Sequence, residues 1–374
     1  MRIVIVSTAY PLRGGITHYV SLLYDHLSKN HDVSVITFKR QYPKLLFPGK
    51  SQEEKGVQSA NYIAPQIVDS INPLTWFKTG RIAAEKSPDL LIFKYWMPFF
   101  APAFGTIARV AKKKSECKVL LICDNVLPHE RTPLDRSLTS WLFKAADFFI
   151  VQSKSVEKDL LSVVGNPRYR FVPHPVYEIF GNKVDKQEAR DRLGIGRDEK
   201  VVLFFGYIRK YKGLHVLLDA MKEVLKSVAV RLLVVGEFYD DERSYRDQIA
   251  ELGLSDKLKL VSDYVPNEEV ATYFSAADVV VLPYTDATQS GIAQIAYNFD
   301  RPIIATDVGG LAEVVIDGRT GLVVPPNSPA ELARAIARFF AEGLSSQLSA
   351  GVAEQKKLYS WDNLVQSIEE LVGK

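Results

Sequence analysis

A short basic turn in the second half of the chain carries the clearest chemical signal. The apolar run Val201–Phe205 ends at Gly206, and three cationic side chains, among them Arg209 and Lys212, follow before Gly213 opens a helical pattern. The junction of a strand, a tight turn and a helix N-terminus favours anions, because unpaired N–H groups and the helix dipole attract negative charge. The two side chains predict a doubly charged guest such as a diphosphate. A solvated turn with ordinary surface cations is the alternative.

Two glycines near the N-terminus form a second candidate. Gly14 and Gly15 follow Pro11 and precede a helical pattern that starts near Thr17. Glycine permits positive φ and lets the backbone approach a ligand closely. The pair therefore predicts a ligand-facing loop, and the alternative is a plain tight turn between a strand and a helix.

Acidic and basic side chains follow an apolar segment in the first half. Asp124, His129 and Glu130 come after Val119–Ile122, which predicts a buried strand. Carboxylates and imidazoles are the usual groups for proton transfer, so these three residues are candidates for catalytic contact. A structural role is the alternative, and for a lone histidine it is the commoner one.

Alternating strands and helices must position these candidates. In the first half we expect strands at Arg2–Ser7, Val33–Phe38, Leu90–Phe93, Val119–Ile122 and Phe148–Val151. In the second half we expect them at Val201–Phe205, Arg231–Val235, Leu258–Val261, Val279–Leu282 and Ile303–Ala305. Helical patterns separate them, which predicts an α/β protein with two doubly wound, Rossmann-like domains.

The domain boundary is predicted between Val172 and Lys200, where prolines and then charged residues interrupt the pattern. The charged run Lys183–Arg192 predicts a solvated surface helix. His18 is expected on a helix surface and His174 at the hinge. An amphipathic C-terminal helix must dock its apolar face, and packing on the first domain is one option. The expected segments are 1–178, 179–355 and 356–374.

Composition limits the class of protein. The 374 residues are 47% hydrophobic and 24% charged, which is ordinary for globular proteins and predicts two domains. Cys117 and Cys123 form no ligand pattern, which argues against a zinc site or a disulfide scaffold and favours a reducing compartment. The apolar region Leu90–Val110 is interrupted by charges and prolines, so a membrane span is not expected. We expect a cytoplasmic protein.

Charge is distributed unevenly along the chain. Residues 1–178 hold 24 Lys and Arg against 15 Asp and Glu, and residues 179–374 hold 23 against 29. A basic first half predicts an anionic partner, either a phosphorylated acceptor or an anionic membrane, whereas no nucleic-acid-binding motif is present. Aromatic and basic residues mix in four segments, which fits peripheral membrane contact or, alternatively, core aromatics beside solvated lysines. These segments are Phe38–Lys50, Trp76–Arg81, Tyr95–Phe104 and Arg109–Lys114.

Five motifs in order resemble a known family. The chain is similar to the retaining glycosyltransferases of family 4, the group of glycogen-synthase-like and mannosyltransferase-like enzymes. The resemblance implies a GT-B architecture, with two Rossmann-like domains facing a cleft, a nucleotide-sugar donor on the second domain and the acceptor on the first. The motifs are Gly14-Gly15, Phe205–Gly213, Ala276–Pro283, Arg301–Gly310 and Gly318–Val324.

The resemblance also assigns roles to individual residues. It places Arg209 and Lys212 at the donor diphosphate and Gly14-Gly15 at the donor phosphates or the transferred sugar. Asp124 stands where relatives often have histidine. Many relatives have arginine directly after the first glycine of the turn, where this chain has Tyr207. No Asp-x-Asp metal motif is present, and we expect no metal or other cofactor.

One loop departs from the family pattern. Relatives carry two glutamates separated by seven residues, and Ala287 and Ile295 occupy those positions here. A polar loop remains, and backbone amides at its helix N-terminus could hold phosphate or sugar hydroxyls. Glu313 follows a glycine pair in a loop that relatives place near the donor, although a helix-cap role is equally open. The loop candidates are Asp286, Thr288, Gln289, Ser290 and Gly291.

The leading prediction is a retaining glycosyltransferase that moves a sugar from a nucleoside-diphosphate sugar to a carbohydrate or lipid-linked acceptor. A catalytically silent, glycosyltransferase-like binding partner is one alternative, because the glutamate pair is missing. A nucleotide-sugar epimerase is the other.

Overall fold

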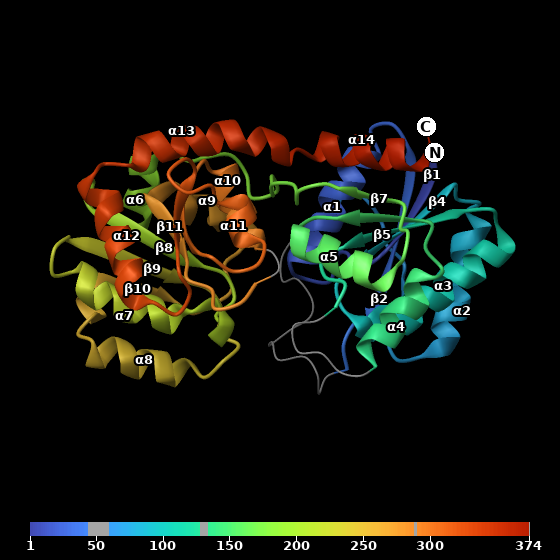
Figure 1. Cartoon of the computed structure of the whole chain (residues 1–374), viewed down its shortest axis with the longest axis horizontal. Coiled ribbons are helices and arrows are strands. Elements are labelled where there is room, and N and C mark those ends of the chain that lie inside the picture. The colour runs from blue at the N-terminus through green and yellow to red at the C-terminus, as the bar shows by residue number, and fades with distance from the viewer. Residues whose placement is uncertain (44–59, 128–133, 288–289, 374) are drawn as a thin grey trace. The chain divides into compact units, whose positions relative to one another are not determined.

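A computed structural model describes residues 1–43, 60–127, 134–287 and 290–373. The chain forms two compact units (Figure 1): unit 1 comprises Met1–Pro175 with Ser360–Lys374, and unit 2 comprises Val176–Tyr359. The first division falls after residue 175 instead of 178, and the returning segment begins at 360 instead of 356. In unit 2, Val176 N donates to the Tyr359 carbonyl oxygen at 3.0 Å, so the two ends of this unit are hydrogen-bonded to each other.

Unit 1 is built on a seven-stranded parallel sheet with the order β3-β2-β1-β4-β5-β6-β7. Its strands are β1 (Arg2–Val6), β2 (Asp32–Arg40), β3 (Gln66–Asp69), β4 (Leu90–Tyr95), β5 (Lys118–Cys123), β6 (Phe148–Val151) and β7 (Tyr169–Phe171). Its helices are α1 (Gly15–Leu27), α2 (Pro73–Glu85), α3 (Ala101–Lys114), α4 (Asp135–Phe143), α5 (Lys154–Val163) and α14 (Trp361–Val372).

Different helices cover the two faces of the unit 1 sheet (Figure 1). Alternate side chains such as Val4, Phe93 and Leu121 pack with α3, α4 and α5 on one face. On the other face α1 meets α14, and the rings of Tyr19 and Trp361 lie 4.9 Å apart. Burial on both faces explains why these strands are near-continuous apolar runs in the sequence.

Unit 2 is built on a six-stranded parallel sheet with the order β10-β9-β8-β11-β12-β13. Its strands are β8 (Lys200–Phe205), β9 (Val230–Val235), β10 (Leu258–Val261), β11 (Val279–Leu282), β12 (Ile303–Thr306) and β13 (Gly321–Val324). Its α-helices are α6 (Lys186–Leu193), α7 (Leu214–Val224), α8 (Glu242–Glu251), α9 (Asn267–Ala276), α10 (Gly291–Asn298), α11 (Leu311–Val314), α12 (Pro329–Ala341) and α13 (Ser345–Gln355).

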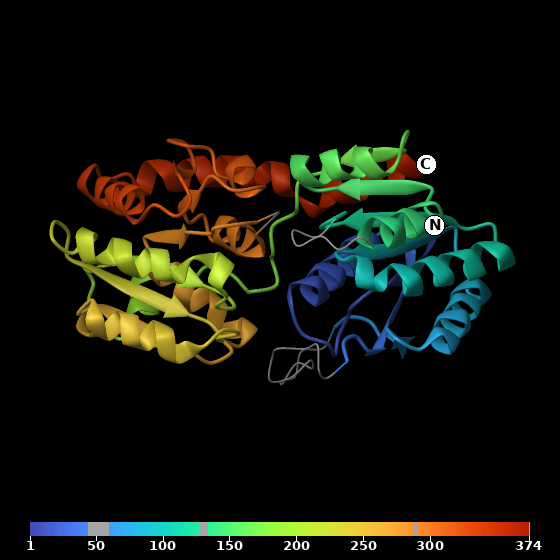
Figure 2. The same ribbon diagram turned by 60° about the horizontal axis from the view of Figure 1, so that its bottom comes forward.

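The unit 2 sheet is also covered on both faces (Figure 2). Val202, Leu232 and Val281 pack with α7, α8 and α12, whereas the Phe205 ring contacts Phe274 of α9 on the opposite face. The predicted α/β class with two doubly wound parallel sheets is confirmed. Strand order reverses between β1 and β4 in unit 1 and between β8 and β11 in unit 2. Open α/β sheets bind ligands at the carboxyl ends of strands beside such reversals.

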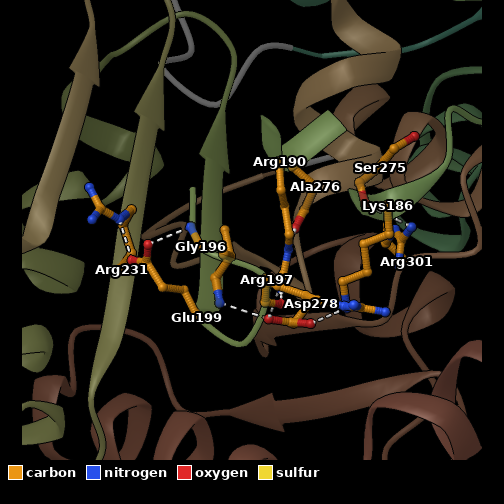
Figure 3. Close-up of polar contacts among 11 residues, drawn as sticks. Lys186, Arg190, Gly196, Arg197, Glu199, Arg231, Ser275, Ala276, Asp278 and Arg301 are labelled. Carbon is orange, nitrogen blue, oxygen red and sulfur yellow. Dashed lines mark hydrogen bonds and ion pairs between the residues drawn. The ribbon is translucent and has the colours of Figure 1, made fainter. Parts of the chain in front are cut away.

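A buried ion cluster holds the opposite, amino ends of the unit 2 strands (Figure 3). Asp278, which precedes β11, accepts hydrogen bonds from Arg190 Nη2 at 3.1 Å and from Val201 N at 2.7 Å. The Arg190 side chain is 5% exposed. The prediction of a solvated helix over 183–192 is therefore wrong for Arg190, which α6 turns inward because the buried carboxylate needs a counter-charge.

Within the described ranges, no helix combines the length and the apolar character that crossing a membrane requires.

Candidate functional site

The carboxyl ends of β8 and β9 in unit 2 are packed backbone to backbone. Gly206 and Gly236 have φ values of +102° and +146°, which glycine adopts readily. A β-carbon at Gly236 would overlap the Gly206 carbonyl oxygen. A β-carbon at Gly206 would lie 2.9 Å from Ile292 Cδ1 and 3.2 Å from Lys212 Nζ. The Lys212 ammonium and the first turn of α10 therefore lie next to the point where β8 ends.

Lys212 is a buried cation. It ends a short 3₁₀ turn, Lys210–Lys212, and the residue is only 8% exposed. Burial first, and then the charge of Arg209, lowers the pKa of Lys212 to about 8. Among the described residues no carboxylate forms an ion pair with it. A buried ammonium of this kind is stabilised by an anionic ligand.

Arg209 is the exposed partner of Lys212, and two tyrosines support it. Its guanidinium carbon lies 4.8 Å from the centroid of the Tyr239 ring, which is a cation–π distance. The Tyr207 ring meets the Tyr239 ring edge-on at 4.7 Å. Tyr207, the departure from the family pattern, therefore buttresses the ring on which Arg209 lies. Lys210 is exposed, as expected for a surface cation.

The N-terminus of α10 lies on the same side of the sheet. Ser290 caps this helix by accepting a hydrogen bond from Ala293 N at 3.4 Å, and its hydroxyl lies 3.2 Å from the Tyr284 hydroxyl. The Tyr284 ring centroid is 5.6 Å from Lys212 Nζ. Gly291 begins the helix, so its amide is among those without an intrahelical partner. The basic turn after β8 and the N-terminus of α10 together form one site with cationic side chains and unpaired backbone N–H groups.

The other loop candidates divide into three groups. Asp286 is exposed, and its charge acts on the neighbouring Tyr211. Ala287 and Ile295 are buried apolar residues, so no carboxylate replaces the missing glutamates at those positions. Thr288 and Gln289 lie outside the described residues.

Glu313 lies in the first turn of α11, which follows β12. Its charge acts on Tyr359, the last residue of unit 2. The same region is tied together by Tyr297, whose hydroxyl donates to the Val314 carbonyl oxygen at 2.7 Å. Glu313 is therefore placed at the carboxyl side of the sheet, near Tyr359.

Unit 1 holds the remaining candidates. Gly14 has φ +118°, precedes α1 and has open space where a β-carbon would stand, whereas Gly15 is already helical. Asp124 follows β5 and forms an ion pair with Lys94 of β4. His129 and Glu130 lie outside the described residues.

His18 is a correction to the sequence analysis. The prediction of a helix-surface position is wrong, because His18 is 8% exposed. Burial lowers its pKa to about 4, so the imidazole is neutral at physiological pH.

The structure places two of the four mixed aromatic and basic segments of unit 1, Tyr95–Phe104 and Arg109–Lys114, against the core, and residues 44–50 of a third lie outside the described residues. Tyr95, Phe100 and Phe104 are completely buried in the core. Arg109 stacks on Trp141 with its guanidinium carbon 4.0 Å from the ring centroid. These positions follow the core alternative, and the segment around α2 behaves differently, as described below.

A surface hollow in unit 2 lies away from the basic turn. Its lining includes Gly196, Lys200 and Ser227, near the amino ends of β8 and β9. Parallel sheets bind ligands at the other end, so we do not assign this hollow to the site. Across the described parts of the chain, no group of three or more His, Cys, Asp and Glu side chains has a metal-binding arrangement.

Two family models match the chain in agreement with this geometry. Glycosyltransferase Family 4 matches residues 13–177, and Glycosyl transferases group 1 matches residues 199–342. Together they account for most of both units. The chain belongs to the family 4, group 1 glycosyltransferases.

Individual relatives are distant. The D-inositol 3-phosphate glycosyltransferase of Acidothermus cellulolyticus is 30% identical over 60% of this chain and 52% of its own length. An uncharacterized glycosyltransferase of Methanocaldococcus jannaschii is 25% identical over 98% of this chain and 96% of its own length. The chain thus spans about half the length of the D-inositol 3-phosphate glycosyltransferase and nearly all of the second protein.

Solved structures share the fold. Sucrose-phosphate synthase from Thermosynechococcus elongatus superposes with a TM-score of 0.77 and 22% identity, covering 99% of this chain and 98% of that one. Anabaena HepE, crystallised with UDP-glucose, gives a TM-score of 0.75 and 18% identity over 98% of each chain.

Lys94 and Tyr239 were missed as contributors to the candidate sites. An isolated lysine within the apolar run Leu90–Tyr95 is the signal that could have identified Lys94, because a buried charge needs a partner. Tyr239 lies beyond the end of β9 and joins the site through the bridge between Ile208 and Phe238, which no local sequence pattern predicts.

Proposed function

We propose that this protein transfers a sugar from a nucleoside-diphosphate sugar to a hydroxyl-bearing acceptor, with retention of anomeric configuration. The observation that carries the proposal is the buried Lys212 ammonium beside exposed Arg209 at the end of β8. Two cations and an adjacent helix N-terminus suit a diphosphate. Family membership supports the reaction class.

The same groups account for leaving-group activation. As the bond between sugar and diphosphate breaks, negative charge builds on the phosphate oxygens, and Arg209 and Lys212 stabilise that charge. Side-chain cations would then take the place of a metal ion, so we propose that no metal is required. The departing phosphate would accept the acceptor proton on the face it leaves, which gives retention.

Unit 1 is proposed to bind the acceptor through the carboxyl ends of β1, β4 and β5, where Gly14 and Asp124 lie. Its positive net charge suits a phosphorylated acceptor. The names of the D-inositol 3-phosphate glycosyltransferases make D-inositol 3-phosphate the first acceptor to test. The UDP-glucose complex of Anabaena HepE makes UDP-glucose the first donor.

The direct test is incubation of the full chain with UDP-, GDP- and ADP-glucose, each with and without D-inositol 3-phosphate. The proposal expects release of one nucleoside diphosphate and a product heavier by one hexose in mass spectrometry, unaffected by EDTA. Failure to release any nucleoside diphosphate with these or other sugars would contradict it. Activity that EDTA abolishes would overturn the metal-independent part alone.

A catalytically silent partner is the second candidate, because buried apolar Ala287 and Ile295 occupy the positions of the missing glutamates. Nucleotide binding without turnover would favour it.

Peripheral membrane contact is proposed for the surface of α2. Leu74 and Phe77 of α2 are 78% and 48% exposed, and Ile71, just before the helix, is 48% exposed. The cations Lys78 and Arg81 are exposed on the same helix. Apolar side chains beside cations suit the headgroup region of an anionic bilayer.

The test is co-sedimentation with lipid vesicles. The full chain should co-sediment with phosphatidylglycerol vesicles and less with phosphatidylcholine vesicles. Leu74→Ser with Phe77→Ser should abolish this, whereas Leu161→Ser, at an exposed leucine on α5, should not; equal sedimentation of all variants would contradict the proposal.

A further inference from the structure

A buried lysine in unit 1 is fully engaged by its neighbours. Lys94 Nζ donates to Asp124 Oδ1 at 2.5 Å and to Gln152 Oε1 at 2.8 Å, and lies 3.6 Å from the centroid of the Tyr19 ring. These three partners match the three N–H bonds of an ammonium group. At 1% exposure Lys94 has no surface to offer a ligand.

The Asp124 carboxylate, in contrast, has one oxygen bonded to Lys94 and one oxygen to which no described protein group donates. Its side chain is 22% exposed, and its backbone N–H donates to the Tyr95 carbonyl oxygen at 2.8 Å. Oδ1 accepts from Lys94. Among the described residues, no protein group donates to Oδ2. The carboxylate therefore has one oxygen fixed by the protein and one available to a hydrogen-bond donor at the carboxyl end of the sheet.

The cluster is sealed by a second layer of side chains. Gln152 Nε2 donates to the Tyr19 hydroxyl at 3.1 Å, so the amide that receives Lys94 is itself oriented. The His174 ring packs edge-on against Tyr19 with centroids 5.1 Å apart. Burial, with a smaller contribution from the charge of Lys94, lowers the pKa of His174 to about 4, so this ring is neutral at physiological pH.

If this ion pair served stability alone, its burial would be costly. Burial lowers the pKa of Lys94, and the charge of Asp124 and its hydrogen bond act in the opposite direction. Apolar residues of similar size often replace buried ion pairs without loss of stability. Perturbed ionisable groups gathered at the ligand-binding end of a sheet are typical of functional sites.

We propose that Lys94 is a positioning residue, which orients Asp124 so that Oδ2 accepts a hydrogen bond from a hydroxyl group of the sugar acceptor. The inference rests on the proposed function and names the group in unit 1 that holds the acceptor. Hydroxyl groups make short, strong hydrogen bonds to carboxylates. Lys94 acts through Asp124 and does not touch the substrate.

The test is a double-mutant cycle on the full chain with Lys94→Met, Asp124→Asn and both together. UDP-glucose and D-inositol 3-phosphate are the probes, or the donor that the turnover assay selects. Each single variant should lower kcat/KM for the acceptor by roughly 10- to 100-fold, because a misplaced contact costs rate of that order. The double variant should lose no more kcat/KM than the less active of the two single variants, because Lys94 acts only through Asp124. The KM for the donor should stay at its wild-type value.

Two controls separate positioning from structural support. Lys112 forms an ion pair with Asp147 at 2.9 Å in the same unit, and Lys112→Met should leave kcat/KM unchanged. Lys94→Gln keeps an N–H donor toward Asp124 and should recover part of the activity lost in Lys94→Met; it also serves the cycle if the methionine variant does not fold. A lower melting temperature with wild-type kcat/KM, or losses that multiply in the double variant, would overturn the proposal. A wild-type protein that neither binds UDP nor transfers a sugar would instead overturn the proposed function, and this inference with it.

Discussion

Gly213 lies so close to Pro283 that a β-carbon at position 213 would overlap the Pro283 carbonyl oxygen. Gly213 follows the basic turn after β8 and precedes α7, and Pro283 follows β11. The contact therefore joins the two strands between which the sheet order reverses. It places Arg209 and Lys212 at that reversal, where ligands bind in open α/β sheets.

Gly213→Ala should destabilise unit 2 and weaken nucleotide binding together. Gly213 has φ +71°, and the new methyl group would displace either α7 or the end of β11. We expect a loss of about 1–3 kcal/mol in the free energy of unfolding, measured by urea denaturation. Gly194→Ala is the matched control, because Gly194 has φ +67° but open space around its β-carbon position. Equal losses in both variants would contradict the role of the Pro283 contact.

Nucleotide binding should weaken at alkaline pH. The pKa of Lys212 is lowered to about 8, and its charged form is the one that attracts phosphate. UDP affinity should be constant just below that pH and then fall, approaching about tenfold per pH unit. Titration calorimetry from about pH 7 to about pH 10 measures this. Lys212→Met should bind UDP weakly with no such decline, and a decline that persists in this variant would assign the effect to another group.

The free energy of unfolding should increase as the pH rises, whereas the UDP affinity decreases. In the unfolded chain the pKa of lysine is near its ordinary value of 10.5, so the unfolded state binds more protons than the folded state between about pH 8 and 10.5. The burial penalty on Lys212 is fully present below pH 8 and is relieved as pH rises through that window. Relative to Lys212→Met, the wild type should gain up to about 3 kcal/mol, at about 1.4 kcal/mol per pKa unit. A stability difference that does not vary between pH 7 and pH 10.5 would show that Lys212 is not desolvated in the folded protein.

The Tyr239 ring should matter for donor affinity through Arg209. Tyr239→Leu removes the cation–π contact of about 0.5–1 kcal/mol, so UDP affinity should fall about two- to fivefold. Tyr239→Phe keeps the ring and should bind like the wild type. If the phenylalanine variant binds as weakly as the leucine variant, the hydroxyl group and not the ring is responsible.

Asp278→Asn should be among the most destabilising single substitutions in unit 2. It leaves the buried Arg190 guanidinium without its counter-charge, which typically costs about 3–5 kcal/mol. Glu331→Gln, which removes an exposed ion pair with Arg334, should cost less than about 1 kcal/mol. Denaturant midpoints of the two variants provide the comparison, and similar values would contradict the inward role of Arg190.

The fold was largely predictable because its central strands are buried on both faces. Val119–Ile122 and Val279–Leu282 are continuous apolar runs, and both form strands at those positions. The short edge strands β3, β7 and β13 were not predicted. The burial of β7, for example, is intermediate at Tyr169 and exposed at Arg170, so its sequence resembles a loop. Pairing with β6 creates that strand, and a non-local contact leaves no periodic signal.

Site residues were predictable where they follow directly on their own strand, and unpredictable where they depend on contacts between different strands. Arg209 and Lys212 follow their own strand, so the sequence places them at its carboxyl end. The pairing of Lys94 with Asp124 joins β4 to the end of β5, and the support of Arg209 by Tyr239 joins β8 to β9. Both depend on strand order, which local patterns do not determine. Arg190 was misassigned because a charge in a polar helix gives no sign that it faces inward.

The central claim is that the turn after β8 holds the diphosphate of a nucleotide sugar. Calorimetric titration of the full chain with UDP, GDP and ADP tests it most directly, with Arg209→Ala compared against Lys210→Ala at the neighbouring exposed cation. Selective binding of one nucleotide is expected, weakened about 10- to 100-fold in Arg209→Ala, as for loss of a charge-assisted hydrogen bond, and unchanged in Lys210→Ala. Binding that is unaffected by Arg209→Ala, or absent for all three nucleotides, would contradict the claim.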